Sequence, residues 1–137
     1  MKDIAKKYFI EQGYSCSEAV LKAAIDKGFA PKEILMCATS FSGGMGSGCL
    51  CGAVAGAQLV LGAVFGRMES SQDASLCRQK AKALVEEFRT RHKFTCCKAL
   101  TAGFDMGTKD RKLHCSSMVE SACDILENLL KEQKLPV

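Results

Sequence analysis

Residues 43–56 read Gly-Gly-Met-Gly-Ser-Gly-Cys-Leu-Cys-Gly-Ala-Val-Ala-Gly. This stretch places two thiols on a glycine-rich turn, directly before an apolar run that predicts a helix as far as Phe65. The run is short for a bilayer span and includes Gln58, which favours a buried core helix. Its Gly-x-x-x-Gly spacings put small residues one turn apart and allow another backbone to approach closely. We therefore expect this Gly/Ala-rich segment to be the central helix of a bundle.

Helical patterns lie on both sides of the glycine-rich turn. Ser15 and Glu18 have the spacing of a capping box, and Asp73 and Thr95 are predicted N-caps of later helices. The other predicted helices cover residues 2–12, 16–28, 31–41, 73–92, 95–100 and 113–131, and a glycine-containing loop covers 103–111. No repeat or linker interrupts them. The sequence predicts an all-α fold, with one domain over residues 1–137 and a compact bundle of about five to six helices.

The composition supports this fold class and excludes several functions. The chain is 47% hydrophobic and 25% charged with two prolines, a globular and helix-favouring balance. Its net charge of +4 is spread along the chain, so the basic residues indicate solvated helix faces and no nucleic-acid partner. The N-terminal segment Met-Lys-Asp-Ile-Ala-Lys-Lys has no apolar signal region. We expect a cytoplasmic protein that does not bind a membrane.

Nine cysteines in 137 residues are the strongest chemical signal. In the cytoplasm thiols are kept reduced, so this number points to metal binding or redox chemistry more than to a disulfide framework. The sequence has no Cys-x-x-Cys, no haem-attachment motif and no ferredoxin-like run of cysteines. A metal site would therefore collect its ligands from distant segments. No Ser-His-Asp or paired-carboxylate arrangement supports hydrolase chemistry.

Four cysteines, Cys16, Cys51, Cys97 and Cys115, fall in the first turn of a predicted helix. Unpaired amides and the positive end of the helix dipole favour a thiolate there, which is the form that attacks disulfides and binds metals. Cys49 and Cys96 lie beside two of these positions and are candidates for additional ligands or resolving thiols. The remaining residues of interest are expected to pack in apolar stripes or to lie on the surface: Cys37, Cys77 and Cys123 in stripes, His92 and His114 on the surface.

The segment Cys-Gly-Ala-Val-Ala-Gly at 51–56, with one cysteine before it and two after it, resembles the C_GCAxxG_C_C family of redox-active proteins. The resemblance spans nearly the whole chain and places the family cysteines at Cys16, Cys51, Cys97 and Cys115. It implies a helical protein with four essential cysteines and a redox role. Related domains occur in split-Soret type cytochromes, where an iron–sulfur cluster has been proposed. Cys96 beside Cys97 leaves two alternatives for the third position.

Three functions are compatible with these cysteines. The first is an iron–sulfur cluster for electron transfer or redox sensing, because four convergent helix ends would offset its negative charge. The alternatives are a metal-free thiol–disulfide redox protein and a structural zinc module. The expected partner is another redox protein. A homodimer is also expected, through the glycine-patterned helix.

Overall fold

The computed structural model describes residues 1–105 and 107–131, and within them the chain is all-α, as expected. Met106, in the expected loop, and residues 132–137 of the expected domain lie outside the described residues. Six α-helices, a 3₁₀ helix (η1) and an irregular π-helical turn (η2) are described, slightly more than the five to six helices expected. Their bounds are α1 Lys2–Glu11, α2 Cys16–Asp26, η1 Lys32–Phe41, η2 Gly44–Gly48, α3 Gly52–Phe65, α4 Ser75–His92, α5 Cys97–Leu100 and α6 Lys109–Lys131.

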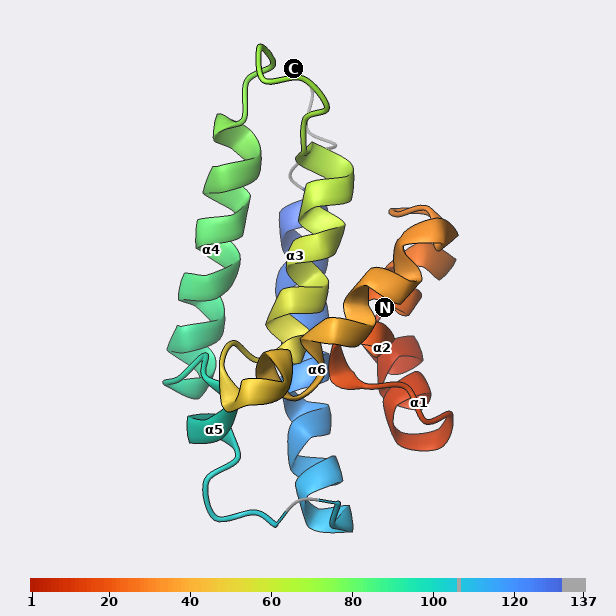
Figure 1. Ribbon diagram of the computed structural model, residues 1–137, viewed down its shortest axis with the longest axis vertical. Helices are drawn as coiled ribbons and strands as arrows, with labels where there is room; N and C mark the ends of the chain where they lie inside the picture. Colours follow the sequence, from red (N-terminus) through yellow and green to blue (C-terminus); the bar gives the residue numbers. More distant parts are fainter. Residues whose placement is uncertain (106, 132–137) are drawn as a thin grey trace.

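Three long helices, α3, α4 and α6, run along the long axis of the molecule (Figure 1). The helices α3 and α4 form an antiparallel pair, α2 and η1 cover the other side of α3, and α1 packs against α2 and α6. The helix α3 packs against α2, α4, α6 and η1, while α6 packs against α1, α2, α3 and α4. The core is thus shared between α3 and α6, and the expected arrangement around one central helix is not confirmed. No helix in the described part of the chain is long and apolar enough to cross a bilayer.

Gly52 and Gly56, the first glycine pair of α3, lie where other helices of the same chain pack closely against α3. A Cβ atom on Gly56 would lie 2.5 Å from the carbonyl oxygen of Ser17, and one on Gly52 would lie 3.1 Å from that of Phe41. These glycines therefore let α2 and η1 approach α3 more closely than a side chain would allow. A Cβ atom on Gly62, in contrast, would meet open space. Contact with α2 and η1 therefore explains the first glycine pair of α3, and it does not explain Gly62.

The beginnings of α4 and α5 differ from the sequence prediction. The N-cap of α4 is Ala74, and the carboxylate of Asp73 instead accepts bonds from the backbone N–H and the hydroxyl of Ser75, at 2.9 and 2.6 Å. The N-cap of α5 is Cys96, so Thr95 is not its cap. Both helices nevertheless begin within two residues of the predicted position.

The helix α6 begins four residues earlier than the predicted start at residue 113. The hydroxyl of Thr108 accepts a 3.2 Å bond from the N–H of Arg111, and its carbonyl accepts a 3.1 Å bond from the N–H of Lys112. Thr108 therefore satisfies the first amides of α6 in the manner of an N-cap. This earlier start adds a cationic first turn to the helix.

Candidate redox centre

Cys51 and Cys97 are brought together by a short backbone pairing. Leu50 and Cys96 form an isolated antiparallel bridge. The N–H of Cys51 donates to the carbonyl of Thr95 at 2.7 Å, and the N–H of Cys97 donates to the carbonyl of Cys49 at 2.5 Å. These bonds hold the residues that precede α3 beside those that begin α5.

The glycine-rich turn packs directly onto this pairing. Gly44 has a φ of +63°, and a Cβ atom there would lie 2.6 Å from the backbone nitrogen of Cys49 and 2.8 Å from the Cβ atom of Cys97. No other residue type fits this position without displacing the backbone. Gly44 therefore allows the glycine-rich turn to pack against Cys49 and Cys97.

Three of the four predicted cysteines lie at helix starts. Cys16 is the first residue of α2, Cys51 is the N-cap of α3, and Cys97 is the first residue of α5. Cys115 is the exception, because α6 begins at Lys109 and so places it in the second turn. The expectation of a first-turn position for Cys115 is wrong, and the amides at the start of α6 do not account for its environment.

The structure nevertheless brings all four cysteines into one neighbourhood. The charge of Cys16 would interact with Cys97 and Cys115, that of Cys51 with Cys16 and Cys97, and that of Cys115 with Cys97. Each thiol thus lies within electrostatic range of at least two others. We refer to Cys16, Cys51, Cys97 and Cys115 as the thiol cluster.

Burial is the main cause of the pKa shifts of Cys16 and Cys51. It raises the pKa of Cys16 to about 11 and that of Cys51 to about 12. Backbone N–H groups, from Ser17 and Gly43 for Cys16 and from the first turn of α3 for Cys51, lower these pKa values by less. The expected depression of the pKa at helix starts is therefore outweighed by desolvation. Raised pKa values of this size keep both groups protonated at neutral pH in the reduced, metal-free protein.

Arg111 places a positive charge beside Cys97 and Cys115. Its Nη2 atom lies 4.0 Å from the Sγ atom of Cys97. Burial raises the pKa of Cys115, and the hydrogen bond and charge of Arg111, with the charge of Lys112, partly oppose that rise. From the sequence, Arg111 was expected at the end of a loop over residues 103–111 and had no assigned role. The available signal was its spacing, because within a helix Arg111 lies one turn before Cys115.

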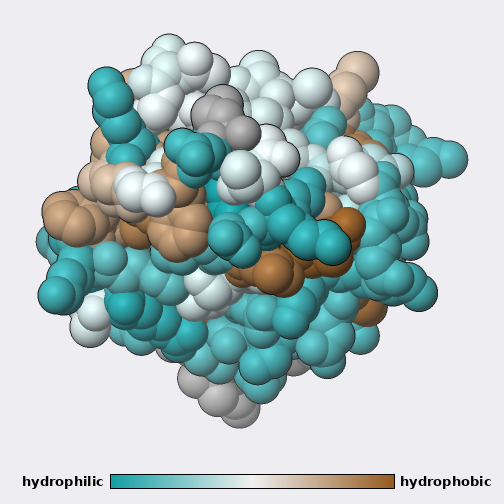
Figure 2. Space-filling model, turned by 90° about the horizontal axis from the view of Figure 1, so that it is seen from below, coloured by the Kyte–Doolittle hydropathy of each residue, from teal (hydrophilic) through white to brown (hydrophobic). Residues whose placement is uncertain are grey.

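A pocket of about 710 Å³ opens beside the thiol cluster. Cys16, Cys97 and Cys115 line it, whereas Cys51 is buried and is not among the lining residues. Figure 2 shows the molecule from below the view of Figure 1, where hydrophobic residues lie next to hydrophilic ones on the surface. Three of the four thiols can therefore be reached from the same opening.

Cys49 and Cys96 lie outside the thiol cluster despite their sequence positions. Both are exposed, and the thiol of Cys96 donates to the carbonyl of Gly48 at 2.9 Å. Of the adjacent pair Cys96 and Cys97, only Cys97 lines the pocket and interacts with the other three cysteines.

The other cysteines have separate environments. Cys123 is fully buried in α6, as predicted for a packing residue. Cys77 is half-buried, and its thiol lies 3.8 Å from the carbonyl of Leu61. Cys37 is exposed, so its predicted place in an apolar stripe is wrong. The 3₁₀ geometry of η1 explains this, because a repeat of three residues per turn changes which side chains share a face.

The two histidines are half-buried and held by neighbouring residues. His114 contacts the carbonyl of Leu100 through Nε2 at 2.7 Å and stacks on Phe104. His92 contacts the hydroxyl of Ser121 at 2.9 Å. Neither histidine lines the pocket. Within residues 1–105 and 107–131, no three His, Cys, Asp or Glu side chains are arranged to hold a single metal ion.

Comparison with known proteins gives one match. A family model described as "Putative redox-active protein (C_GCAxxG_C_C)" matches residues 14–129. No curated protein and no solved structure matches the chain. The matched range includes the thiol cluster, the glycine-rich turn and the segment 51–56. The chain therefore belongs to the C_GCAxxG_C_C family.

Proposed function

We propose that this chain is a redox protein in which Cys16, Cys51, Cys97 and Cys115 bind an iron–sulfur cluster for electron transfer or redox sensing. The observation that supports this proposal is the convergence of these four thiols, from four separate helices, in one neighbourhood where three of them line the same pocket. Four cysteine thiolates are the common ligand set of such clusters. When bound, the cluster supplies one-electron transfer.

The residues around the thiols suit a group of negative charge. Backbone N–H groups point to the sulfur atoms of Cys16 and Cys51, and the guanidinium of Arg111 lies beside Cys97 and Cys115. Hydrogen bonds and positive charge of this kind stabilise thiolates that bind a metal. The neutral thiols of the metal-free protein would release protons on binding, which makes affinity increase with pH.

A structural zinc ion bound by the same four cysteines is the less favoured function. Zinc has no redox chemistry of its own. The family whose model matches the chain is described as redox-active.

A metal-free thiol–disulfide reaction is the second candidate, and the position of Arg111 favours it. The hydrogen bond and charge of Arg111 partly oppose the burial that raises the pKa of Cys115, which favours Cys115 as the thiol that would attack an external disulfide. Formation of a Cys97–Cys115 disulfide removes two electrons and two protons, which reduce the external disulfide to two thiols. Cys16 and Cys51 are poor attacking groups at neutral pH, because burial keeps them protonated.

The test is purification without oxygen, followed by iron, sulfide and zinc analysis per chain and a visible spectrum. The proposal predicts iron, sulfide and charge-transfer absorption. Zinc alone would indicate a structural site. A colourless protein after anaerobic reconstitution, with a reversible two-electron couple, would exclude the cluster and support disulfide exchange.

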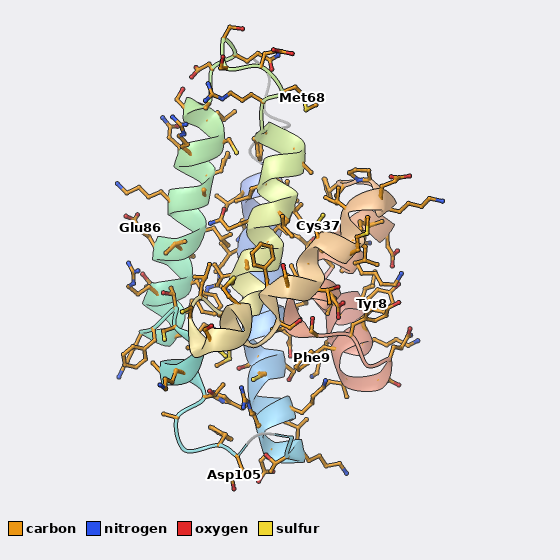
Figure 3. All side chains as sticks on the ribbon, viewed as in Figure 1. Tyr8, Phe9, Cys37, Met68, Glu86 and Asp105 are labelled. Carbon is orange, nitrogen blue, oxygen red and sulfur yellow. The ribbon has the colours of Figure 1, made fainter. Side chains whose placement is uncertain are left out.

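Serine variants of the four cysteines identify the ligands. Each of Cys16→Ser, Cys51→Ser, Cys97→Ser and Cys115→Ser is expected to lower the iron content. Cys37→Ser is the matched control, because Cys37 is exposed on η1, away from the end of the molecule that carries Asp105 (Figure 3). Equal iron loss in the control would show that the iron is not bound by the thiol cluster. The homodimer and the redox partner remain predictions, which sedimentation and co-purification test.

A further inference from the structure

The pocket beside the thiol cluster has a one-sided charge. Its lining includes Lys109, Arg111 and Lys112 from the first turn of α6, and no Asp or Glu is among the described residues that line it. Positive side chains around a partly enclosed space raise the local concentration of anions. Of the three thiols at this pocket, Cys97 and Cys115 lie closest to the positive charge of Arg111.

The size of the pocket indicates the class of ligand. Its volume of about 710 Å³ falls within the range of about 300–1,000 Å³ that is typical of small-molecule sites. The side chains of Phe9 and Ile10 form an apolar wall. The ammonium of Lys112 lies 4.0 Å from the centroid of the Phe9 ring, which holds this charge at the wall. Figure 3 shows Phe9 beside α6.

We propose that this pocket binds a small anion, a carboxylate or an oxyanion, and holds it beside Cys97 and Cys115. Lys109 and Arg111 would bind its negative group, and the apolar wall would contact the rest of the ligand. This inference goes beyond the proposed function, because binding of the anion requires the pocket and its positive charges but no iron. The two proposals can therefore fail separately.

Alkylation of reduced, metal-free protein tests the proposal with two probes of similar size. Iodoacetate is an anion and iodoacetamide is neutral, and both react with the same thiolate. The ratio of their rates at one cysteine therefore reports the local preference for an anion, independently of the pKa of that thiol. Peptide mass spectrometry gives the ratio for each cysteine, and the exposed Cys37 is the internal reference.

The ratio at Cys97 or Cys115 is expected to exceed that at Cys37 by about threefold or more, as for one positive charge a few ångströms from the probe. Lys109→Gln and Arg111→Gln are each expected to lower the ratio towards the reference value. The control is Lys27→Gln, because Lys27 caps the far end of α2, about 16 Å from Cys16. It is expected to leave the ratio unchanged.

Two results would overturn the proposal. One is a ratio at both pocket cysteines equal to that at Cys37 in the unmodified protein, a result that requires no variant to fold. The other is a raised ratio that neither glutamine variant lowers, because the charges named here would then not be its cause. As a second measurement, inorganic sulfate at constant ionic strength is expected to slow iodoacetamide at Cys97 and Cys115 but not at Cys37.

Discussion

The N–H of Cys97 donates a 2.5 Å hydrogen bond to the carbonyl oxygen of Cys49. Through this bond an exposed cysteine of the glycine-rich turn positions a member of the thiol cluster by its backbone, while its own thiol stays outside. Cys49 is thus exposed and outside the thiol cluster, whereas Cys51, two residues further on, belongs to it. The same division applies to Cys96 and Cys97.

Replacement of Cys96 and of Cys97 should therefore give different results. Cys97→Ser is expected to remove most of the iron, because Cys97 interacts electrostatically with all other members of the thiol cluster. Cys96→Ser is expected to keep the iron, since serine can still donate to the carbonyl of Gly48. Iron per chain after anaerobic purification measures both. The reverse result would assign the third family position to Cys96.

Gly52→Ala should damage the centre and the fold together. The new methyl group would collide with the Sγ atom of Cys16 and lie 3.1 Å from the carbonyl of Phe41. Overpacking of this kind costs about 1–3 kcal/mol of unfolding free energy. Urea unfolding of the metal-free protein measures this cost, and iron analysis reports the displaced sulfur.

The matched control for that variant is Gly62→Ala in the same helix. A Cβ atom on Gly62 meets nothing within 4 Å, so alanine should stabilise α3 by about 0.5–1 kcal/mol. If both alanines destabilised the protein equally, the close packing at Gly52 would not be the cause.

Acid should weaken the start of α2 through Glu18. Its carboxylate accepts bonds from the N–H of Ser15 at 2.9 Å and from the hydroxyl of Thr39 at 2.7 Å, and these bonds lower the pKa of Glu18. A carboxyl group with a lower pKa in the folded state stabilises the protein above its unfolded pKa, which is near 4.5. That contribution is lost as the pH falls through the folded pKa.

The measurement is the urea midpoint at about pH 6 and about pH 3.5. Glu18→Gln is expected to reduce the difference between the two midpoints, because the amide does not titrate. Glu86→Gln on the exposed face of α4 is the control and should keep it. An unchanged difference in Glu18→Gln would mean that other carboxyl groups control acid stability.

Alkali should destabilise the metal-free protein through Cys51. Its pKa is raised by burial from 9.0 to about 12, so the folded state holds the proton more tightly than the unfolded state. This stability is fully present below pH 9 and is lost as the pH rises through the folded pKa. Urea midpoints at about pH 8 and about pH 10.5 should differ less in Cys51→Ala than in the unmodified protein. A cluster-bound protein should not show this loss, because its thiols are already deprotonated.

The sequence was sufficient for some parts of the fold and not for others. The capping box of Ser15 and Glu18 is confirmed, because both of its bonds are local. The start of α6 was predicted too late, because residues 109–112 are polar and have no apolar periodicity, so only Thr108 marks the cap.

The candidate site shows a similar division. The positions of Cys16, Cys51 and Cys97 at helix starts could be predicted, since each follows from a local turn. Their acidity could not, because burial of a thiol depends on helices distant in sequence, and here burial outweighs the helix ends. Arg111 was missed for the same reason: its contact with Cys97 joins α6 to α5.

The pairing of the segments around Leu50 and Cys96 also has a consequence for assembly. It joins the first half of the chain, which supplies Cys16 and Cys51, to the second half, which supplies Cys97 and Cys115. Neither half contains more than two of the four thiols, so a nascent or truncated chain cannot bring all four together. Closing such long loops is a late event in folding. A group bound by all four thiols would therefore bind only after the fold is complete. Once bound, it would slow unfolding, because the two halves of the chain could not separate without breaking its bonds to the thiols.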